Sequence, residues 1–194
     1  YKRQVLDVRY WVMKPDGTVA ESPATGPQKV SSQDIAGVRL DFAPVGSQEK
    51  QTLYYFRFNL RNDSWQRHEK FISFLKDFGT LTTFAKAASY LMHKPHYSGI
   101  RQFILSQSDF VLQGDSAIPV RYFDRTAWNL RFFGTYSRPI NYFKKFQQKD
   151  LTEIYQKGTD VYPLPFGIDY YHRINTSNLM FAAKRAELAG SASK

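Results

Sequence analysis

The sequence predicts an α+β fold in which an antiparallel sheet, formed by an N-terminal meander and C-terminal strands, carries two or three central helices on one face. Three observations predict this class. Apolar residues alternate with polar ones over the first sixty residues, recur at helical spacing between about residues 63 and 104, and alternate again near the end. Strands, then helices, then strands is the order typical of α+β proteins.

Three N-terminal segments have the alternation of half-buried strands: residues 5–13, 37–42 and 53–60. The first is followed by Lys14-Pro15-Asp16-Gly17, which has the composition of a turn. Residues 21–34 are rich in Ser, Pro, Gly and Gln, and we predict a loop there. These features predict an antiparallel meander with one face exposed to solvent.

The middle of the chain has the apolar spacing of helices. One helix is predicted from a cap at Asp63 or Ser64 to Gly79, a second covers residues 80–93, and a third begins at Pro95. Further along we expect strands over residues 120–123, 128–136, 167–174 and 178–183, and a short helix over residues 150–157.

Length and composition fit a single domain over residues 1–185 with a flexible tail over residues 186–194. The absence of cysteine excludes disulfides, thiolate nucleophiles and Cys-ligated metals. No apolar run is long enough to span a membrane, which favours a soluble protein. Because the chain begins at Tyr1 rather than Met, we expect a processed product or part of a longer protein, and an extracytoplasmic location is favoured over a cytoplasmic one.

The formal net charge is +10, and more than half of it lies in residues 121–149. Seven basic residues in this stretch accompany a single acidic one, Asp124, and nine aromatic residues are interleaved with them. Cations beside aromatic rings bind single-stranded nucleic acids, and acidic glycans also need cations and stacking surfaces. The candidate ligand-binding residues are Arg121, Tyr122, Trp128, Arg131, Tyr136 and Arg138.

The same stretch also fits an ordinary strand. In that reading Trp128, Leu130 and Phe132 face the core, and Arg131 faces solvent. The sequence contains no aromatic RNP motif and no zinc finger, so a glycan is favoured over nucleic acid as the anionic partner.

The loop over residues 113–119 holds the candidates for an active site. Asp115 and Ser116 could form a nucleophilic triad with the distant His93, although the chain lacks the GxSxG elbow of hydrolases. The alternative is a turn in which Asp115 or Ser116 binds nearby backbone amides. His93 and His96 are three residues apart, but no HExxH motif accompanies them, so we predict neither a metal nor a cofactor.

Four phrases of the chain resemble a bacterial family of uncharacterised proteins: residues 86–93 (KAASYLMH), 112–119 (LQGDSAIP), 121–123 (RYF) and 165–168 (PFGI). The resemblance covers roughly residues 50–183. It implies a bacterial origin, and it implies that the chain is the C-terminal portion of a longer protein. The family loop reads closer to Gln-Asp-Asp-Ser-Gly-Ile-Pro, so Gly114 and Ala117 depart from it. The family has no assigned activity, and the resemblance therefore assigns no catalytic residue.

Taken together, the sequence predicts a non-catalytic binding or structural module that recognises an anionic ligand, such as a glycan, through a basic and aromatic surface. Two alternatives stay open. One is a hydrolase-like enzyme with its site near residues 115–122, and the other is nucleic-acid binding through residues 121–149.

Overall fold

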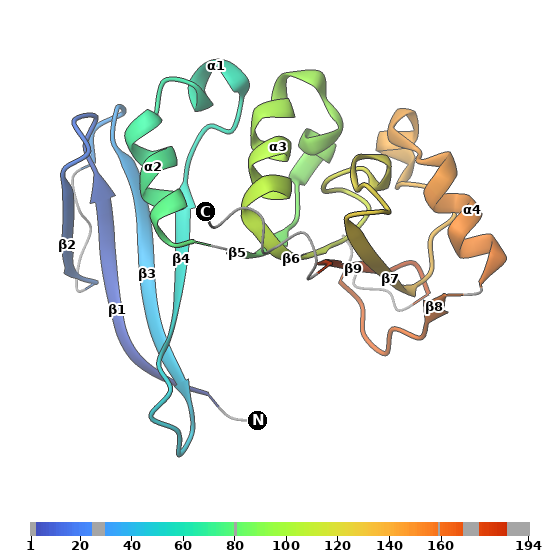
Figure 1. Cartoon of the computed structure of the whole chain (residues 1–194), viewed down its shortest axis with the longest axis horizontal. Coiled ribbons are helices and arrows are strands. Elements are labelled where there is room, and N and C mark those ends of the chain that lie inside the picture. The colour runs from blue at the N-terminus through green and yellow to red at the C-terminus, as the bar shows by residue number, and fades with distance from the viewer. Residues whose placement is uncertain (1–2, 25–29, 80, 159, 169–174, 186–194) are drawn as a thin grey trace. The chain divides into compact units, whose positions relative to one another are not determined.

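The computed structural model describes residues 3–24, 30–79, 81–158, 160–168 and 175–185, and it has the predicted α+β class (Figure 1). The strands form two sheets rather than one, a four-stranded antiparallel sheet and a five-stranded mixed sheet. Where the sequence suggested one domain over residues 1–185, the contacts group the chain into two compact units. The N-terminal unit comprises Tyr1–Leu60 and Ser64–Asp77, and the C-terminal unit comprises Arg61–Asp63 and Phe78–Lys194.

The N-terminal unit is built on a sheet with the strand order β2-β1-β3-β4. Its strands are β1 (Arg3–Met13), β2 (Val19–Pro23), β3 (Ile35–Pro44) and β4 (Gln51–Arg57), and each neighbouring pair is antiparallel. The meander predicted from three alternating segments is confirmed as β1, β3 and β4. The segment predicted as a loop over residues 21–34 instead begins inside an edge strand, β2, which pairs with β1 after the tight turn at residues 14–17.

Helix α2 (Glu69–Asp77) lies against one face of this sheet (Figure 1), and aromatic rings hold it there. Trp11 of β1 is 1% exposed, and its ring centroid lies 4.9 Å from those of Phe56 and Phe74. Phe71 meets Phe56 edge to face at 5.0 Å. Each such pair contributes about 0.5–1.5 kcal/mol beyond the burial of apolar area, so the cluster fixes the helix on the sheet.

The helix predicted from Asp63 or Ser64 to Gly79 is present as two helices, α1 (Asn62–Trp65) and α2 (Glu69–Asp77). Gly79 follows α2 with a φ of +73°. This left-handed conformation commonly ends a helix, and glycine adopts it without a steric penalty. The helical segment therefore ends where the sequence predicts, but it is interrupted between Trp65 and Glu69.

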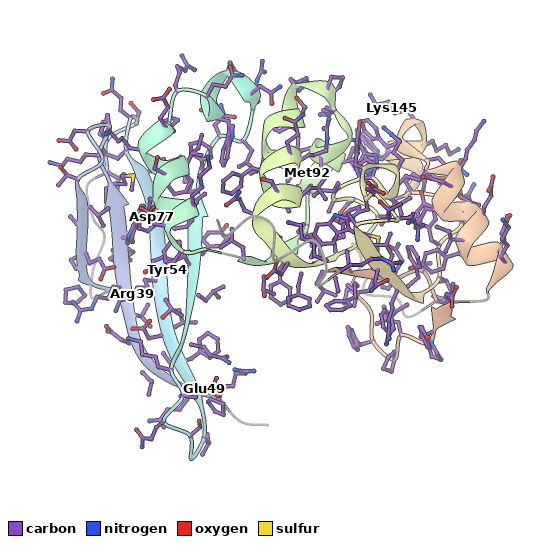
Figure 2. The ribbon with its side chains drawn as sticks, viewed as in Figure 1. Arg39, Glu49, Tyr54, Asp77, Met92 and Lys145 are labelled. Atoms are coloured by element: carbon purple, nitrogen blue, oxygen red, sulfur yellow. The ribbon has the colours of Figure 1, made fainter. Side chains whose placement is uncertain are left out.

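A network of charged groups lies on the same sheet. The carboxylate of Asp41 is almost fully buried, and it accepts hydrogen bonds from the Thr52 hydroxyl at 2.8 Å and from the Arg39 guanidinium at 2.9 Å. The ammonium of Lys50 lies 2.8 Å from it, and Arg39 also pairs with Glu21 of β2. Lys50 and Arg39 hold the pKa of Asp41 well below its usual value. The network links β2, β3 and β4 (Arg39 and Tyr54 mark its position in Figure 2).

Replacing Asp41 by Asn is expected to destabilise the protein by about 1–3 kcal/mol, because Arg39 and Lys50 lose a buried, charged acceptor. Thermal unfolding followed by circular dichroism would show a lower Tm. Glu49→Gln is the matched control, since Glu49 is exposed near the same sheet. Because the pKa of Asp41 is lowered in the folded state, its contribution is present above about pH 4 and is lost as the pH falls further. Equal Tm values for the two variants would contradict the assigned role.

The C-terminal unit is built on a sheet with the strand order β5-β6-β9-β7-β8. Its strands are β5 (Leu81–Ala85), β6 (Ser108–Gln113), β7 (Trp128–Gly134), β8 (Val161–Tyr162) and β9 (Asn178–Lys184). β5 is parallel to β6 and β7 is parallel to β8, whereas β9 is antiparallel to both β6 and β7. The carboxyl ends of β5, β6, β7 and β8 therefore share one edge of the sheet with the amino end of β9.

Helical segments connect the parallel pairs, since parallel strands need crossovers. The β5–β6 connection contains two 3-10 segments, Ala88–His93 and Pro95–Tyr97, followed by α3 (Ser98–Gln107). The β7–β8 connection contains the 3-10 segment Asn141–Phe146 and α4 (Lys149–Lys157). The hydroxyl of Tyr155 donates to the carbonyl of Phe133 at 3.0 Å, which holds α4 against β7.

Two predictions for this unit are wrong. The helix expected over residues 80–93 is strand β5 followed by a 3-10 segment, because β5 pairs with β6, and the β-branched Thr82 and Thr83 fit such a strand. The strand expected over residues 120–123 is a 3-10 turn closed by the Tyr122 amide donating to the Pro119 carbonyl. In addition, β6 is not among the predicted strands.

The helix beginning at Pro95, the strands near residues 128–136 and 178–183, and the helix near residues 150–157 are confirmed as α3, β7, β9 and α4. Most of the strand predicted over residues 167–174 and the tail predicted over residues 186–194 lie outside the described residues. No helix in the part of the chain that the structure describes is long and apolar enough to cross a membrane.

Candidate functional site

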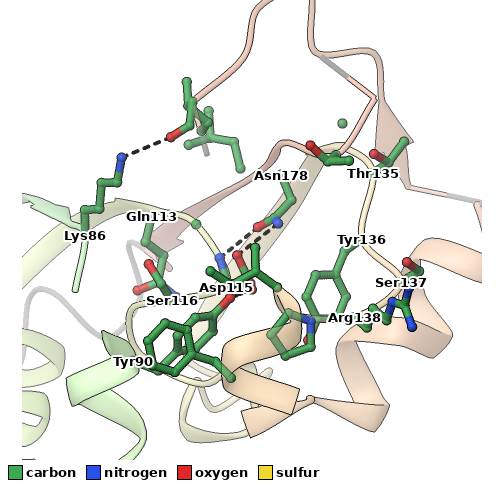
Figure 3. Close-up of a pocket in the computed structure, with 18 of the residues that line it drawn as sticks. Lys86, Tyr90, Gln113, Asp115, Ser116, Thr135, Tyr136, Ser137, Arg138 and Asn178 are labelled. Atoms are coloured by element: carbon green, nitrogen blue, oxygen red, sulfur yellow. Dashed lines mark hydrogen bonds between the residues drawn. The ribbon is translucent and has the colours of Figure 1, made fainter. Parts of the chain in front are cut away.

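A cavity of about 1070 Å³ lies at the shared edge of the five-stranded sheet (Figure 3). Its lining includes Lys86 after β5, Asp115 after β6 and Tyr136 after β7, together with Asn178, the first residue of β9. Ligands of open sheets with parallel strands bind beyond the carboxyl ends of those strands, where the loops leave a crevice. The position and size of the cavity make it the candidate ligand site of the C-terminal unit.

Asp115 is held by hydrogen bonds to its main chain and to its side chain. Its amide donates to the Asn178 side-chain oxygen at 2.7 Å, and the Asn178 amide group donates back to Oδ1 at 3.1 Å (Figure 3). The Tyr90 hydroxyl lies 2.6 Å from Oδ2. The carbonyl of Asp115 contacts His93 Nε2 at 2.9 Å and Gln148 Nε2 at 3.0 Å. The carboxylate therefore has a fixed position in the cavity wall before a ligand binds.

These contacts define the protonation of His93. A carbonyl oxygen only accepts hydrogen bonds, so Nε2 carries the hydrogen and Nδ1 is the unprotonated nitrogen of the neutral ring. Burial lowers the pKa of His93 to about 4. Because Gln148 also accepts from the Val120 amide at 2.8 Å, the orientation of its side-chain amide is fixed as well. His93 is thus a neutral donor that supports the Asp115 main chain.

Tyr90 reaches Asp115 through an unusual backbone conformation. Ser89 and Tyr90 have φ values of 55° and 54°, in the left-handed region that residues with a side chain avoid. Each such residue costs roughly 1–2 kcal/mol. The Tyr90 ring is buried, stacks on Phe146 at 5.7 Å and contacts Phe143 at 5.0 Å. This packing and the hydrogen bond to Asp115 offset the strain.

Gly134 shapes the cavity where β7 ends. Its φ is +84°, and a Cβ atom at this position would overlap the carbonyl oxygen of Ser177. The same oxygen accepts a hydrogen bond from the Thr135 amide at 2.9 Å, and the Ser177 hydroxyl accepts one from the Ile168 amide at 2.9 Å. The turn before β9 therefore lies directly against the end of β7, and only glycine leaves room for this approach.

Cations and aromatic rings line the rest of the cavity. Arg138 is exposed and forms no ion pair with any described residue, whereas Lys86 donates to the Ile168 carbonyl at 3.1 Å. Three lining rings are strongly exposed: Phe84 (73%), Tyr142 (90%) and Phe166 (52%).

Two lining tyrosines are neutral at physiological pH. Burial raises the pKa of Tyr136 to about 12 and also raises the pKa of Tyr155. Because both phenols keep their protons, neither adds negative charge to the cavity. Asp115 is the carboxylate among the described residues that line it.

The structure separates the predicted ligand-binding residues. Tyr136 and Arg138 line the cavity, whereas Arg121, Tyr122, Trp128 and Arg131 are not part of its wall. Trp128 is buried and packs edge to face on Phe123, while Arg131 is exposed on β7, as in the ordinary-strand reading. The guanidinium groups of Arg121 and Arg101 lie 4.9 and 4.6 Å from the centre of the Tyr122 ring.

The three candidate catalytic residues lie in or beside the cavity wall, but not as a triad. Ser116 lines the cavity and is 8% exposed, and no hydrogen bond joins its hydroxyl to His93 within the described residues. His93 instead binds the main chain of Asp115. Sequence reasoning missed Lys86, Tyr90 and Asn178. The first two fell within the helix predicted over residues 80–93, and only the correct strand assignment of β5 would have placed them at the sheet edge.

No family model, curated protein or solved structure matches this chain. Among the residues that the structure describes, no three His, Asp or Glu side chains gather as ligands for a metal ion.

Replacing His93 by Gln should remove one component of the pH dependence of stability, because Gln keeps a donor for the Asp115 carbonyl but does not titrate near neutral pH. With a folded pKa of about 4, below the ordinary value of about 6.5, the unfolded chain binds more protons between these pH values. Stability therefore falls as the pH drops through this window, by an amount on the order of 2 kcal/mol.

Urea unfolding at pH 7 and pH 4.5 measures this effect. We expect a smaller loss for His93→Gln than for the wild type, and the wild-type loss for a control variant, His96→Gln, at an exposed histidine. An identical loss in all three proteins would show that His93 is not buried in its neutral form.

Proposed function

We propose that the C-terminal unit is a non-catalytic binding module of bacterial origin and that its cavity binds an anionic ligand, with an acidic glycan as the favoured class. One observation carries the proposal. The cavity combines an exposed guanidinium, Arg138, with the exposed rings of Phe84, Tyr142 and Phe166. Large exposed apolar side chains are ordinary when scattered, but a group around one cavity is typical of a recognition site.

The chemistry of these groups matches the proposed ligand. A guanidinium offers paired donors in a planar fork, which suits carboxylate, phosphate and sulfate groups. An aromatic face offers an apolar surface to the C–H groups of a sugar ring, and Tyr142 adds a polar hydroxyl at its edge. Lys86 contributes a second positive charge to the wall.

The cavity offers less support for the hydrolase alternative. A serine nucleophile needs an adjacent base, and the described hydrogen bonds of His93 lead to the Asp115 carbonyl instead of Ser116. Nucleic-acid binding through residues 121–149 has less support as well, since Trp128 is buried and two guanidinium groups already contact the Tyr122 ring.

Arg138→Gln should weaken binding of a galacturonic acid trisaccharide about 10-fold, because a charge-assisted hydrogen bond to the ligand is lost. Isothermal titration calorimetry at low and high salt measures this, and the affinity should fall with added salt. Arg131→Gln removes the same charge from an exposed position outside the cavity and should leave binding unchanged. Failure of the wild type to bind the trisaccharide at low salt would reject the proposal, and stronger binding of single-stranded DNA would favour the nucleic-acid alternative.

Tyr142→Ser should weaken the same binding about 3- to 10-fold, since a single exposed ring contributes about 0.5–1.5 kcal/mol of contact. Tyr142 is 90% exposed, so its removal should leave the Tm unchanged. Tyr55→Ser removes another strongly exposed tyrosine, from β4 of the N-terminal unit, and serves as the control. Equal affinities for the two variants would exclude Tyr142 from the binding surface.

A further inference from the structure

The role of Asp115 is not explained by anion binding alone. Its carboxylate lies in the wall of the cavity that Arg138 and Lys86 also line, and an ionised carboxylate repels an anion. Four residues from three other segments nevertheless hold Asp115 in place. Tyr90 and Asn178 bind its carboxylate, and His93 and Gln148 bind its main-chain carbonyl. A ligand that gains from this arrangement has hydrogen-bond donors as well as negative charge.

We infer that the ligand of the cavity is an acidic sugar and that Asp115 is the residue that selects it, by accepting hydrogen bonds from hydroxyl groups of the sugar. The inference rests on the proposed function, because it assigns the ligand class of the same cavity. Arg138 then binds the acidic group of the ligand, and Asp115 distinguishes a hydroxylated anion from a simple one.

The chemistry of the carboxylate suits a ligand with hydroxyl groups. An ionised carboxylate only accepts hydrogen bonds, and its two oxygens together offer four acceptor positions. Hydroxyl groups on neighbouring carbons of a sugar ring are donors with the matching spacing. Hydrogen bonds to a charged acceptor are roughly twice as strong as those between neutral groups, so this contact discriminates well between ligands.

The side chain of Asp115 has a fixed orientation. Asn178 donates to Oδ1 and the Tyr90 hydroxyl contacts Oδ2, so each oxygen has a protein partner that sets the plane of the carboxylate. Both partners are themselves buried. Tyr90 and Asn178 are thus positioning residues, and a ligand that binds Asp115 does not have to order a mobile side chain.

The size and the lining of the cavity also suit a sugar. A volume of about 1070 Å³ exceeds what inorganic phosphate or a small dicarboxylate fills, and it accommodates more than one sugar ring. Figure 3 shows Asp115 and Asn178 in the same cavity wall as Tyr136 and Arg138. The exposed rings of Phe84 and Tyr142 supply apolar faces that only a ligand with C–H groups uses.

The test uses the sign of the effect of Asp115→Asn. If the sugar hydroxyls donate to Asp115, the variant should bind a galacturonic acid trisaccharide about 10- to 100-fold more weakly than the wild type. If the cavity binds only negative charge, removing the carboxylate should strengthen binding. Calorimetric titration with the trisaccharide and, separately, with inorganic phosphate measures both cases. Asp109→Asn, which removes the same charge from β6 outside the cavity wall, should leave the affinity unchanged.

A second variant keeps the inference testable if Asp115→Asn does not fold. Tyr90→Phe retains the ring that packs on Phe143 and Phe146 and removes only the hydroxyl on Asp115, and we expect a roughly 3- to 10-fold loss for the trisaccharide. If both variants fold and bind the trisaccharide as tightly as the wild type or more tightly, the inference is overturned. The same result from Tyr90→Phe alone overturns it if Asp115→Asn does not fold. In either case, weaker binding by Arg138→Gln would still identify the cavity as an anion site. No binding of the trisaccharide to the wild type would overturn the proposed function and this inference together.

Discussion

The hydrogen bonds around Asp115 join four stretches of chain that are distant in sequence. Tyr90 and His93 precede α3, Asp115 follows β6, Gln148 precedes α4 and Asn178 opens β9. A loop at a sheet edge normally varies in conformation, but here its carbonyl, amide and carboxylate are all bonded. The shape of the cavity depends on this point, because the crossovers after β5 and β7 are both attached to it.

The two units differ in whether their basic residues form ion pairs. In the N-terminal unit, Arg39 and Lys50 meet acidic partners on the same sheet, and Asp41 is buried among them. In the C-terminal unit, the basic residues of the 121–149 stretch form no ion pair with a described residue. Pairing stabilises a sheet locally, whereas unpaired cations raise the electrostatic potential around the surface that carries them.

Much of the fold could be predicted from the sequence, because periodicity is a local signal. The alternation in residues 53–60 and the turn at Gly17 predict the N-terminal meander, and Pro95 marks the start of the helical segment that contains α3. The parallel pairing of β5 with β6 was not predictable in this way. Leu81, Phe84 and Ala88 have helical spacing, and only pairing with β6, distant in sequence, stabilises β5 as a strand.

Part of the candidate site could be predicted from the sequence. The loop containing Asp115, and Tyr136 and Arg138 beyond it, were identified from polarity, charge and aromatic content. Tyr90 and Asn178 were not, because their role arises from tertiary hydrogen bonds and leaves no periodic pattern in the chain. The sequence around Trp128 fits both a core position and a ligand-binding position. In the structure Trp128 is buried, and its ring packs on Phe123.

The left-handed pair Ser89 and Tyr90 has a consequence for how this sequence can vary. At position 89 the constraint is on the backbone, so glycine or asparagine would relieve strain, while valine, isoleucine or threonine would increase it. At position 90 glycine would relieve the same strain but remove the ring and the hydroxyl that reach Asp115. Neighbouring residues with nearly identical φ values are thus expected to differ in their tolerance of glycine, which fits at position 89 but removes the contacts made at position 90.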